Sequence, residues 1–240
     1  AARLWPPQSD SPLGATILRG ALQWAEARGL TIVQALIDSG DKAAAARLRD
    51  NGLTLRIDLL YLAAQPGTDP RREALVARRR PGVHFEAIGD LDSPRLEALI
   101  SGIEEGSLDC PELRGARTPA QIIEGFRQQG QYAPQHWCIL RDGEQDAGVL
   151  LLAPHPQTSF WELMYMGVLP AWRGRGLGRE LIAEALRRAL RGGAERLVLS
   201  VDARNHPARE LYERAGFTPF AARSLCAWLA GQGATSGDGR

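Results

Sequence analysis

The chain has 240 residues, of which 44% are hydrophobic, so it can bury the core of one large domain or two small ones. Its formal net charge of +1 gives no electrostatic reason to expect nucleic acid or an anionic membrane as a partner. Cys110, Cys138 and Cys226 cannot form a paired disulfide framework, and no apolar run reaches the ~18–20 residues of a membrane span, so we expect a cytoplasmic protein.

Helical and strand patterns alternate along the first part of the chain. Apolar spacing predicts helices over residues 14–28 and 43–51 and strands over 31–37 and 53–62. Residues 66–81 are rich in proline, glycine and arginine and are expected to form a linker, with Arg78 to Arg80 solvated. The small, polar residues 231–240 are expected to form a flexible tail.

Residues 82–230 contain the larger set of predicted elements. We expect strands at 83–89, 137–141, 147–153, 161–168, 196–201, 217–221 and 223–229, and helices at 94–103, 118–129, 176–191 and 207–215. Ser93 and Thr118 each precede a proline, which is the usual arrangement of an N-cap and the first helical position. Asp142-Gly143 predicts a hairpin turn between two of the strands.

The most informative segment is Arg173-Gly174-Arg175-Gly176-Leu177-Gly178, between a predicted strand and a predicted helix. Small residues at such a turn leave backbone N–H groups uncovered, and the first helical turn has no internal acceptors for its own donors. A phosphate or diphosphate is the natural ligand of these donors. Arg173 and Arg175 would strengthen that preference.

Three kinds of phosphate loop could fit this segment. A P-loop requires Lys-Ser/Thr after its last glycine, and a dinucleotide fingerprint requires a third glycine at position 179, where the chain has Arg179. The third pattern, Arg/Gln-x-x-Gly-x-Gly/Ala, is matched by Arg173, Gly176 and Gly178. It is the pyrophosphate loop of the GNAT acetyltransferases.

A second motif lies after the next predicted strand. The pattern Asn-x-x-Ala-x-x-x-Tyr-x-x-x-Gly-Phe is matched by Asn205, Ala208, Tyr212, Gly216 and Phe217. With both motifs in order, residues 82–229 resemble the GNAT N-acetyltransferase family. The resemblance implies an α/β GNAT fold, with a mixed central sheet, flanking helices, and a splayed strand pair at 161–168 and 196–201 that holds the pantetheine arm.

The resemblance also implies direct transfer of an acetyl group from acetyl-CoA to the primary amine of a small molecule or peptide. The cofactor-binding candidates are Met166, Val168, Arg173, Gly174, Arg175, Gly176, Leu177, Gly178 and Asn205. Among these, the N–H groups of residues 173–178 would hold the pyrophosphate, and an N–H near Met166 or Val168 would polarise the thioester carbonyl. Asn205 would steady the pantetheine or cap the following helix.

Tyr212 and Glu162 are the catalytic candidates. Tyr212 would protonate the leaving thiolate, since a phenol of pKa ~10 can donate once that charge develops; simple ring packing is the alternative. Glu162 would be the base, at the spacing before Arg173 that the histone-acetyltransferase branch uses; an exposed strand-end carboxylate and a water base are the alternatives. Without a bulge, Glu162, Met164, Met166 and Val168 would share one face of the strand.

The loop that contains Asp109 and Cys110 usually lines the acceptor pocket in this family, although ordinary packing is the favoured reading for Cys110. No metal is expected, because no Cys/His cluster has zinc spacing. A non-catalytic CoA-binding regulatory or scaffold protein and an enzyme for longer acyl chains are the alternative functions. We expect either a pseudo-dimeric monomer or a homodimer.

An internal repeat relates the two ends of the chain. Gly14 and Gly178 are 164 residues apart (178 − 14 = 164), and Gly52 and Gly216 have the same separation. Where the later copy has its glycine-arginine turn, residues 9–14 read Ser-Asp-Ser-Pro-Leu-Gly, and Leu48 stands in place of Tyr212. We therefore expect residues 1–65 to form a partial, degenerate GNAT-like unit, as in tandem members of the family; a chance match of α/β segments is the alternative.

Overall fold

The computed structural model describes residues 1–4, 12–67, 75–77, 79–89 and 91–231. It divides into two compact units. The first comprises Ala1–Leu60, Glu112–Arg117 and Ala221–Arg240, and the second comprises Tyr61–Pro111 and Thr118–Phe220. The expected domains, 1–65 and 82–230, are contiguous in sequence, whereas these units divide two strands, β3 (Leu55–Ala64) and β9 (Thr218–Leu229), between them.

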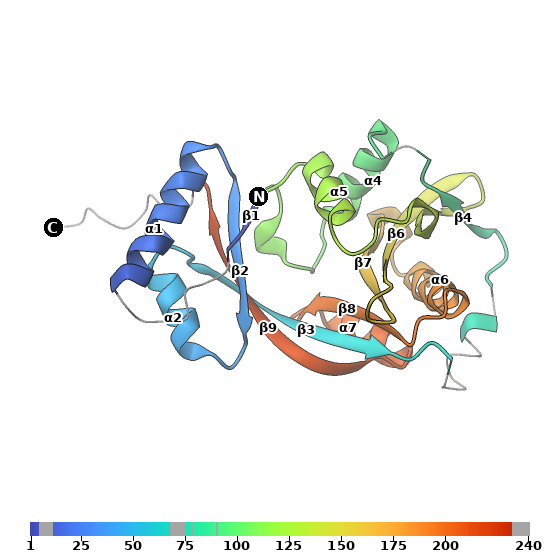
Figure 1. Cartoon of the computed structure of the whole chain (residues 1–240). Coiled ribbons are helices and arrows are strands. Elements are labelled where there is room, and N and C mark those ends of the chain that lie inside the picture. Colours follow the sequence, from blue (N-terminus) through green and yellow to red (C-terminus); the bar gives the residue numbers. More distant parts are fainter. Residues whose placement is uncertain (5–11, 68–74, 78, 90, 232–240) are drawn as a thin grey trace. The chain divides into compact units, whose positions relative to one another are not determined.

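The first unit packs two helices on a small set of strands (Figure 1). Its elements are β1 (Ala2–Arg3), α1 (Pro12–Ala27), β2 (Ile32–Asp38), α2 (Lys42–Asp50) and parts of β3 and β9. Strand β2 pairs with β1 in parallel and with β9 in antiparallel register, from Ile32–Leu229 to Asp38–Arg223. The core joins apolar side chains of α1, β2 and α2 to Cys226, so hydrophobic burial holds the unit together.

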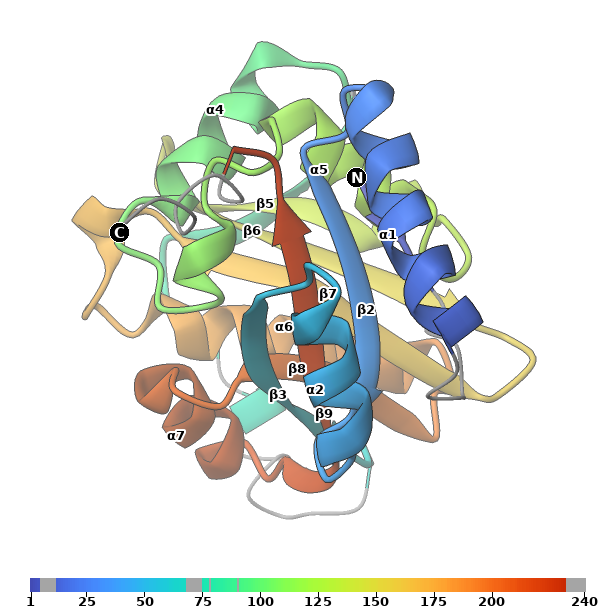
Figure 2. The same ribbon diagram turned by 90° about the vertical axis from the view of Figure 1, so that its left-hand side faces the viewer.

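The second unit is a mixed sheet with helices on both faces (Figure 2). Its strand order is β3-β8-β7-β6-β5-β4, with β4 Val83–Ala87, β5 Trp137–Asp142, β6 Gln145–His155, β7 Phe160–Val168 and β8 Arg196–Asp202. The helices are α4 (Pro94–Glu104), α5 (Pro119–Arg127), α6 (Leu177–Arg191) and α7 (His206–Arg214), and short 3-10 turns occur at Pro111–Leu113, Pro134–His136 and Pro170–Trp172.

Alternation along β5 explains how the helices cover the sheet. Trp137 and Ile139 pack in one core cluster with apolar side chains of α4 and α5. Cys138, which lies between them in sequence, is fully buried outside that cluster; burial raises the pKa of its thiol, and the charge of Arg188 of α6 opposes the rise. Successive strand residues point to opposite faces, so α6 covers the face opposite α4 and α5.

The pairing of β7 changes along its length and creates the notch on which the site depends. Against β6 the register shifts between Leu151 and Leu152, because Leu151 pairs with Tyr165 and Leu152 pairs with Leu163. Met164 is therefore an extra, bulged residue, so the condition under which Glu162, Met166 and Val168 would share one face of the strand is not met. Against β8 the recorded parallel pairs run only from Phe160–Arg196 to Glu162–Val198, so beyond Glu162 the two strands separate.

The expected mixed sheet with flanking helices and a splayed strand pair is confirmed, as are both caps. Ser93 accepts from the Leu96 N–H, and Thr118 forms a capping box with Gln121. Two local expectations are wrong. The expected strands 217–221 and 223–229 are one continuous strand, β9, and the hairpin turn falls one residue later, because Asp142 is still in β5 while Gly143 has a φ of 59°.

The repeat is visible in the element boundaries of the described residues. Shifted by 164 residues, β2 (Ile32–Asp38) has the bounds of β8 (Arg196–Asp202), and α2 (Lys42–Asp50) has those of α7 (His206–Arg214). The preceding segment that should mirror the glycine-arginine turn lies largely outside the described residues, as does the 231–240 tail except Gly231.

Candidate active site

The glycine-arginine turn has the backbone geometry of an anion-binding loop. Gly174 and Gly176 have φ values of 73° and 82°, a region that only glycine adopts without strain. Gly176 is the N-cap of α6, so the positive end of the helix begins at this turn. A Cβ built at either glycine would meet nothing within 4 Å, which leaves the surface of the turn open for a ligand.

The donors of this turn are available. Arg173 N donates to the Pro170 carbonyl, and Arg179 N donates to that of Gly176. Between them, no acceptor within the described part of the chain is recorded for the backbone N–H groups of residues 174–178. A side chain from the preceding segment also contacts the turn, because Arg80 Nη1 donates to the Arg175 carbonyl at 2.7 Å. Arg80 is therefore not merely a solvated side chain, as the sequence suggested.

The side chains of the two arginines are placed differently from the sequence expectation. The Arg173 guanidinium donates to the carbonyls of Val168 (3.0 Å) and Ile103 (2.7 Å), so it fastens the end of β7 to α4. The Arg175 guanidinium lies 5.0 Å from the centre of the Trp172 ring. Arg173 thus positions the site through two protein carbonyls, and the phosphate-binding character of the turn is carried by its backbone.

A cavity of about 400 Å³ lies where β7 and β8 separate. One wall is residues 163–168 of β7, and a second is Gly106 to Asp109 after α4. Arg173, Leu199, Ser200, Asn205, Ala208 and Tyr212 also line it. Five predicted site residues therefore share one cavity, namely Met166, Val168, Arg173, Asn205 and Tyr212, whereas Gly174 to Gly178 lie outside its lining.

Glycines set the width of this region. A Cβ at Gly167 of β7 would come within 2.1 Å of Ile103 Cγ2, and one at Gly102 would come within 2.8 Å of Leu169 Cδ2. Helix α4 therefore approaches β7 as closely as it does only because both positions lack side chains. The same approach brings the Ile103 carbonyl to the Arg173 guanidinium.

Tyr212 is a buried residue of α7 whose ring lies 5.9 Å from that of Phe217. Burial, with a smaller contribution from the nearby negative charge of Asp109, raises the pKa of the Tyr212 phenol well above its usual range. The hydroxyl is therefore protonated throughout the neutral range, which is the form that a general acid requires.

Asp109, which lines the cavity, is tied by hydrogen bonds to Asp202 at the end of β8. Asp109 Oδ1 accepts from the Asp202 N–H at 2.9 Å, and Asp202 Oδ2 accepts from the Cys110 N–H at 3.3 Å. Burial raises the pKa of Asp109. For the fully buried Asp202, hydrogen bonds and charge from Arg204 outweigh the effect of burial and lower the pKa. This clasp joins the loop after α4 to the end of β8, and the sequence gives no signal for it because the partners are distant along the chain.

The two remaining candidates have clear local roles. Asn205 caps α7 by accepting from the Ala208 N–H at 3.3 Å, and it also lines the cavity. Glu162 does not line that cavity. It lies in a neighbouring one, where its carboxylate is 3.1 Å from His155 Nε2, and Leu199 lines both cavities. The sequence did not predict that Glu162 and the later residues of β7 line different cavities, because this depends on the bulge at Met164 that lies between them.

Among the described residues, no group of three or more His, Cys, Asp or Glu side chains is arranged to hold a metal ion. In the same part of the chain, no helix combines the length and apolarity needed to cross a membrane.

Known proteins resemble this arrangement in sequence and in fold. The acetyltransferase (GNAT) family matches residues 104–217. Mycothiol acetyltransferases from Corynebacterium efficiens and Beutenbergia cavernae are each 31% identical, over 70% and 85% of this chain and 56% and 62% of their own lengths. A tandem GNAT protein from the clavulanic acid biosynthesis pathway has a TM-score of 0.59 at 15% identity, over 95% of this chain and 75% of its own.

The chain thus spans less than two thirds of these two mycothiol acetyltransferases. The matched segment, residues 104–217, includes both walls of the cavity, the glycine-arginine turn and Tyr212. Family match and geometry agree that residues 104–217 form a GNAT acetyltransferase domain.

Proposed function

We propose that the protein transfers an acetyl group from acetyl-CoA to a primary amine by direct attack of the amine on the thioester. The single observation that carries the proposal is the cavity between β7 and β8, which has Tyr212 in its wall and an anion-binding turn at the start of the adjoining helix. Acetyl-CoA supplies the activated acyl group. The αL glycines, the N–H groups without recorded acceptors and the open surface of the turn fit its diphosphate.

Each part of the notch has one role in this proposal. The backbone N–H groups of residues 174–178, at the positive end of α6, bind the diphosphate. An N–H of β7 near Met166 or Val168 donates to the carbonyl oxygen of the thioester as negative charge develops there. Asn205 steadies the pantetheine arm while capping α7.

Protons move on opposite sides of the notch. Glu162, directly or through water, takes a proton from the ammonium of the acceptor, so that the neutral nitrogen can attack. The C–N bond then forms, the C–S bond breaks, and the nitrogen gives up its second proton to water as the neutral amide is formed. Tyr212 donates its proton to the departing thiolate and is reprotonated from solvent. Glu162 and Tyr212 line different cavities, and Leu199 belongs to the lining of both. In this proposal the base therefore acts on the acceptor in one cavity, and the acid acts on the coenzyme in the other.

The proposal is tested by two measurements on the whole chain. Acetyl-CoA should raise the Tm by mass action, and a panel of primary amines should then release free CoA thiol only in the presence of an acceptor. Thermal stabilisation without turnover on any amine would instead indicate a CoA-binding protein that does not catalyse transfer.

Glu162→Gln tests the base separately. The acidic limb of the pH profile of kcat/KM should disappear or shift, because the carboxylate no longer accepts the proton. Glu195→Gln removes a more exposed carboxylate from the same cavity and leaves Glu162 in place, so it is the control for the shape of the pH profile and not for the height of kcat/KM. An unaltered profile in Glu162→Gln would assign deprotonation to solvent.

A further inference from the structure

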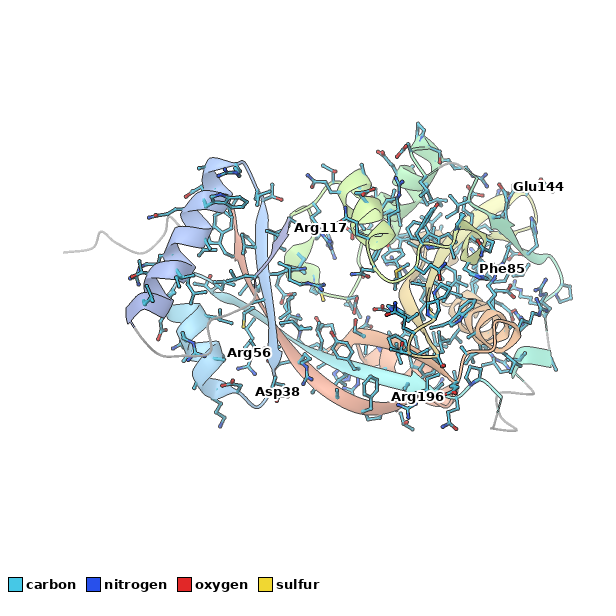
Figure 3. The ribbon with its side chains drawn as sticks, in the orientation of Figure 1. Asp38, Arg56, Phe85, Arg117, Glu144 and Arg196 are labelled. Atoms are coloured by element: carbon cyan, nitrogen blue, oxygen red, sulfur yellow. The ribbon has the colours of Figure 1, made fainter. Side chains whose placement is uncertain are left out.

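The second cavity, on the Glu162 side of the notch, has a volume of about 580 Å³. Tyr61, Phe160 and Phe220 are its aromatic walls, and Glu162, Glu195 and Arg196 are its charged residues. Arg196, labelled in Figure 3, marks the start of β8 beside this cavity. Apart from Glu162, none of these side chains has a role in the transfer chemistry described above.

The position of this cavity relates it to the thioester. Leu199 lines both cavities, and the last recorded pair between β7 and β8, Glu162–Val198, lies at the wall of the second one. The strands separate immediately beyond that pair. The second cavity therefore adjoins the coenzyme cavity near the point where the sheet opens, and Glu162 belongs to its lining.

Phe220 leaves an exposed ring surface beside Tyr61 in the aromatic wall. The Tyr61 and Phe220 rings lie edge to face, with centroids 6.3 Å apart and an interplanar angle of 76°. Phe220 is 58% exposed, which is unusual for a large apolar side chain beside a cavity. Aromatic pairs of this kind gain most when another ring or flat apolar surface covers the exposed face.

The charges of the cavity favour a cation. Two carboxylates, Glu162 and Glu195, face one guanidinium, Arg196, so the formal sum is −1. The carboxylate of Glu162 is held by His155, whose ring stacks on Phe160 at 4.4 Å. A fixed carboxylate beside an aromatic wall suits a ligand that has an ammonium group at one end and a ring at the other.

We infer that the second cavity selects the acceptor, and that this acceptor is a primary amine, positively charged on arrival, whose body carries a ring that packs on Tyr61 and Phe220. The inference rests on the proposed function and adds the substrate class. It also assigns a role to the degenerate repeat, because Tyr61 belongs to β3, the last strand of the N-terminal copy. Residues 9–14 of that copy do not match the Arg-x-x-Gly-x-Gly pattern of the diphosphate turn, but its last strand supplies Tyr61 to one wall of the acceptor site.

The test compares a ring-bearing amine with a small one. For wild type, Tyr61→Ala and Phe220→Ala, kcat/KM is measured with phenethylamine and with n-propylamine at saturating acetyl-CoA. Each alanine variant should lower kcat/KM about tenfold for phenethylamine and less than twofold for n-propylamine, since only the larger amine reaches the aromatic wall. Tyr61→Phe, which keeps the ring, should retain the wild-type preference.

Trp24→Ala is the matched control, because Trp24 is a similarly exposed aromatic residue (53%) on α1 of the first unit. It should leave both rates unchanged. Transfer to amines with no difference between wild type and the two alanine variants would overturn the inference while leaving the proposed function intact.

A binding measurement identifies the opposite case, in which the proposed function fails but the inferred ligand class holds. Calorimetric titration of phenethylamine into the CoA-saturated protein detects the cavity without turnover. If no amine is acetylated but phenethylamine binds wild type and binds Tyr61→Ala about tenfold more weakly, the proposed function fails and the ligand class stands. If phenethylamine binds neither protein, the inference is overturned.

Discussion

The segment α6–β8–α7–β9 and its copy α1–β2–α2–β3 have nearly the same backbone plan but differ in chemistry. After a shift of 164 residues, β2 and β8 coincide in their bounds, as do α2 and α7. The caps are also equivalent, because Asp41 accepts from Ala44 N as Asn205 accepts from Ala208 N. The recurring backbone therefore depends on apolar spacing and caps, which both copies retain.

The differences are confined to a few side chains. Where α7 has Tyr212 in the wall of a cavity, α2 has Leu48, which is fully buried in the core of the first unit. Where α6 begins after Gly176, α1 begins at Pro12, which has no N–H to donate. The comparison teaches that the fold persists without the site, and that single substitutions should remove function from the later copy without unfolding it.

The largest effect is expected from Tyr212. Tyr212→Phe removes only the hydroxyl and should lower kcat about 100-fold, the lower end of the range for general acid catalysis, with little change in the Kd for acetyl-CoA. Tyr212→Leu, which introduces the residue of the other copy, should be no more active. Steady-state kinetics and calorimetry measure the two quantities.

The ring contact with Phe217 is retained in Tyr212→Phe, so its Tm should stay close to that of wild type at neutral pH. Because the folded-state pKa of Tyr212 is raised, its stabilising contribution is complete below pH ~10 and is lost as the pH rises through the folded-state pKa. Tyr212→Phe should therefore lose less stability than wild type above pH ~10. An unchanged kcat would remove Tyr212 from the proton transfer.

The second effect contrasts two equivalent aspartates. Asp202 and Asp38 each accept the backbone N–H two residues later, at 2.8 Å from Arg204 and 3.0 Å from Gly40. Asp202 is fully buried and also accepts from Cys110, whereas Asp38 is exposed. Asp202→Asn should lower the free energy of unfolding by about 2 kcal/mol, the size expected for buried hydrogen bonds to a charged group, and Asp38→Asn by about 0.5 kcal/mol or less.

The pH dependence sharpens this contrast. The pKa of Asp202 is lowered in the folded state, so its contribution is present above the unfolded-state pKa of ~4 and is lost as the pH falls through the folded-state value. The difference in stability between wild type and Asp202→Asn should therefore be constant from pH 5 to 7 and shrink in acid. Urea unfolding at several pH values measures it, and a difference that does not begin to shrink as the pH falls below ~4 would contradict the ionic origin.

The third effect concerns the diphosphate turn. Gly176→Ala places a Cβ at a φ of 82°, which costs about 1–2 kcal/mol, and directs it into the open space above the turn. Gly143→Ala meets the same strain, at a φ of 59° and with nothing within 4 Å, in the hairpin between β5 and β6. Both should lose similar stability, but only Gly176→Ala should raise the Kd for acetyl-CoA, by about tenfold. Equal affinities would argue against diphosphate binding here.

Most of the fold could be predicted because the relevant interactions are local. The caps at Ser93 and Thr118 and the αL glycine before α6 are read within four residues of sequence. The repeat was visible for the same reason, since apolar spacing and glycines recur at one offset. The continuity of β9 was missed because the pairing of its second half with β2 is a long-range interaction that local pattern cannot show.

The site was harder to predict because it is assembled from distant segments. The Asp109–Asp202 clasp joins residues 93 apart in the chain, and the Arg173 guanidinium donates a hydrogen bond to the Ile103 carbonyl, 70 residues away. Glu162 and Tyr212 line different cavities because of the bulge at Met164, and no residue pattern in the sequence predicts that bulge. Motif residues were found by type, whereas their partners required the tertiary structure.

The smallest effect asks whether Asn205 does more than cap its helix. Asp41→Ala and Asn205→Ala each remove one cap and should each lower stability by about 1 kcal/mol, or about 2–4 °C in Tm. Only Asn205 lines the coenzyme cavity, so Asn205→Ala should also raise the KM for acetyl-CoA about threefold, as expected for one lost neutral hydrogen bond. Asn205→Asp keeps the capping oxygen of the other copy but adds a negative charge at the wall of the coenzyme cavity, beside the buried Asp109 that the Asn205 side chain contacts. It should keep the helix cap and weaken acetyl-CoA binding, while repulsion from Asp109 lowers its Tm. A KM equal to that of wild type in both variants would leave Asn205, like Asp41, as a helix cap alone.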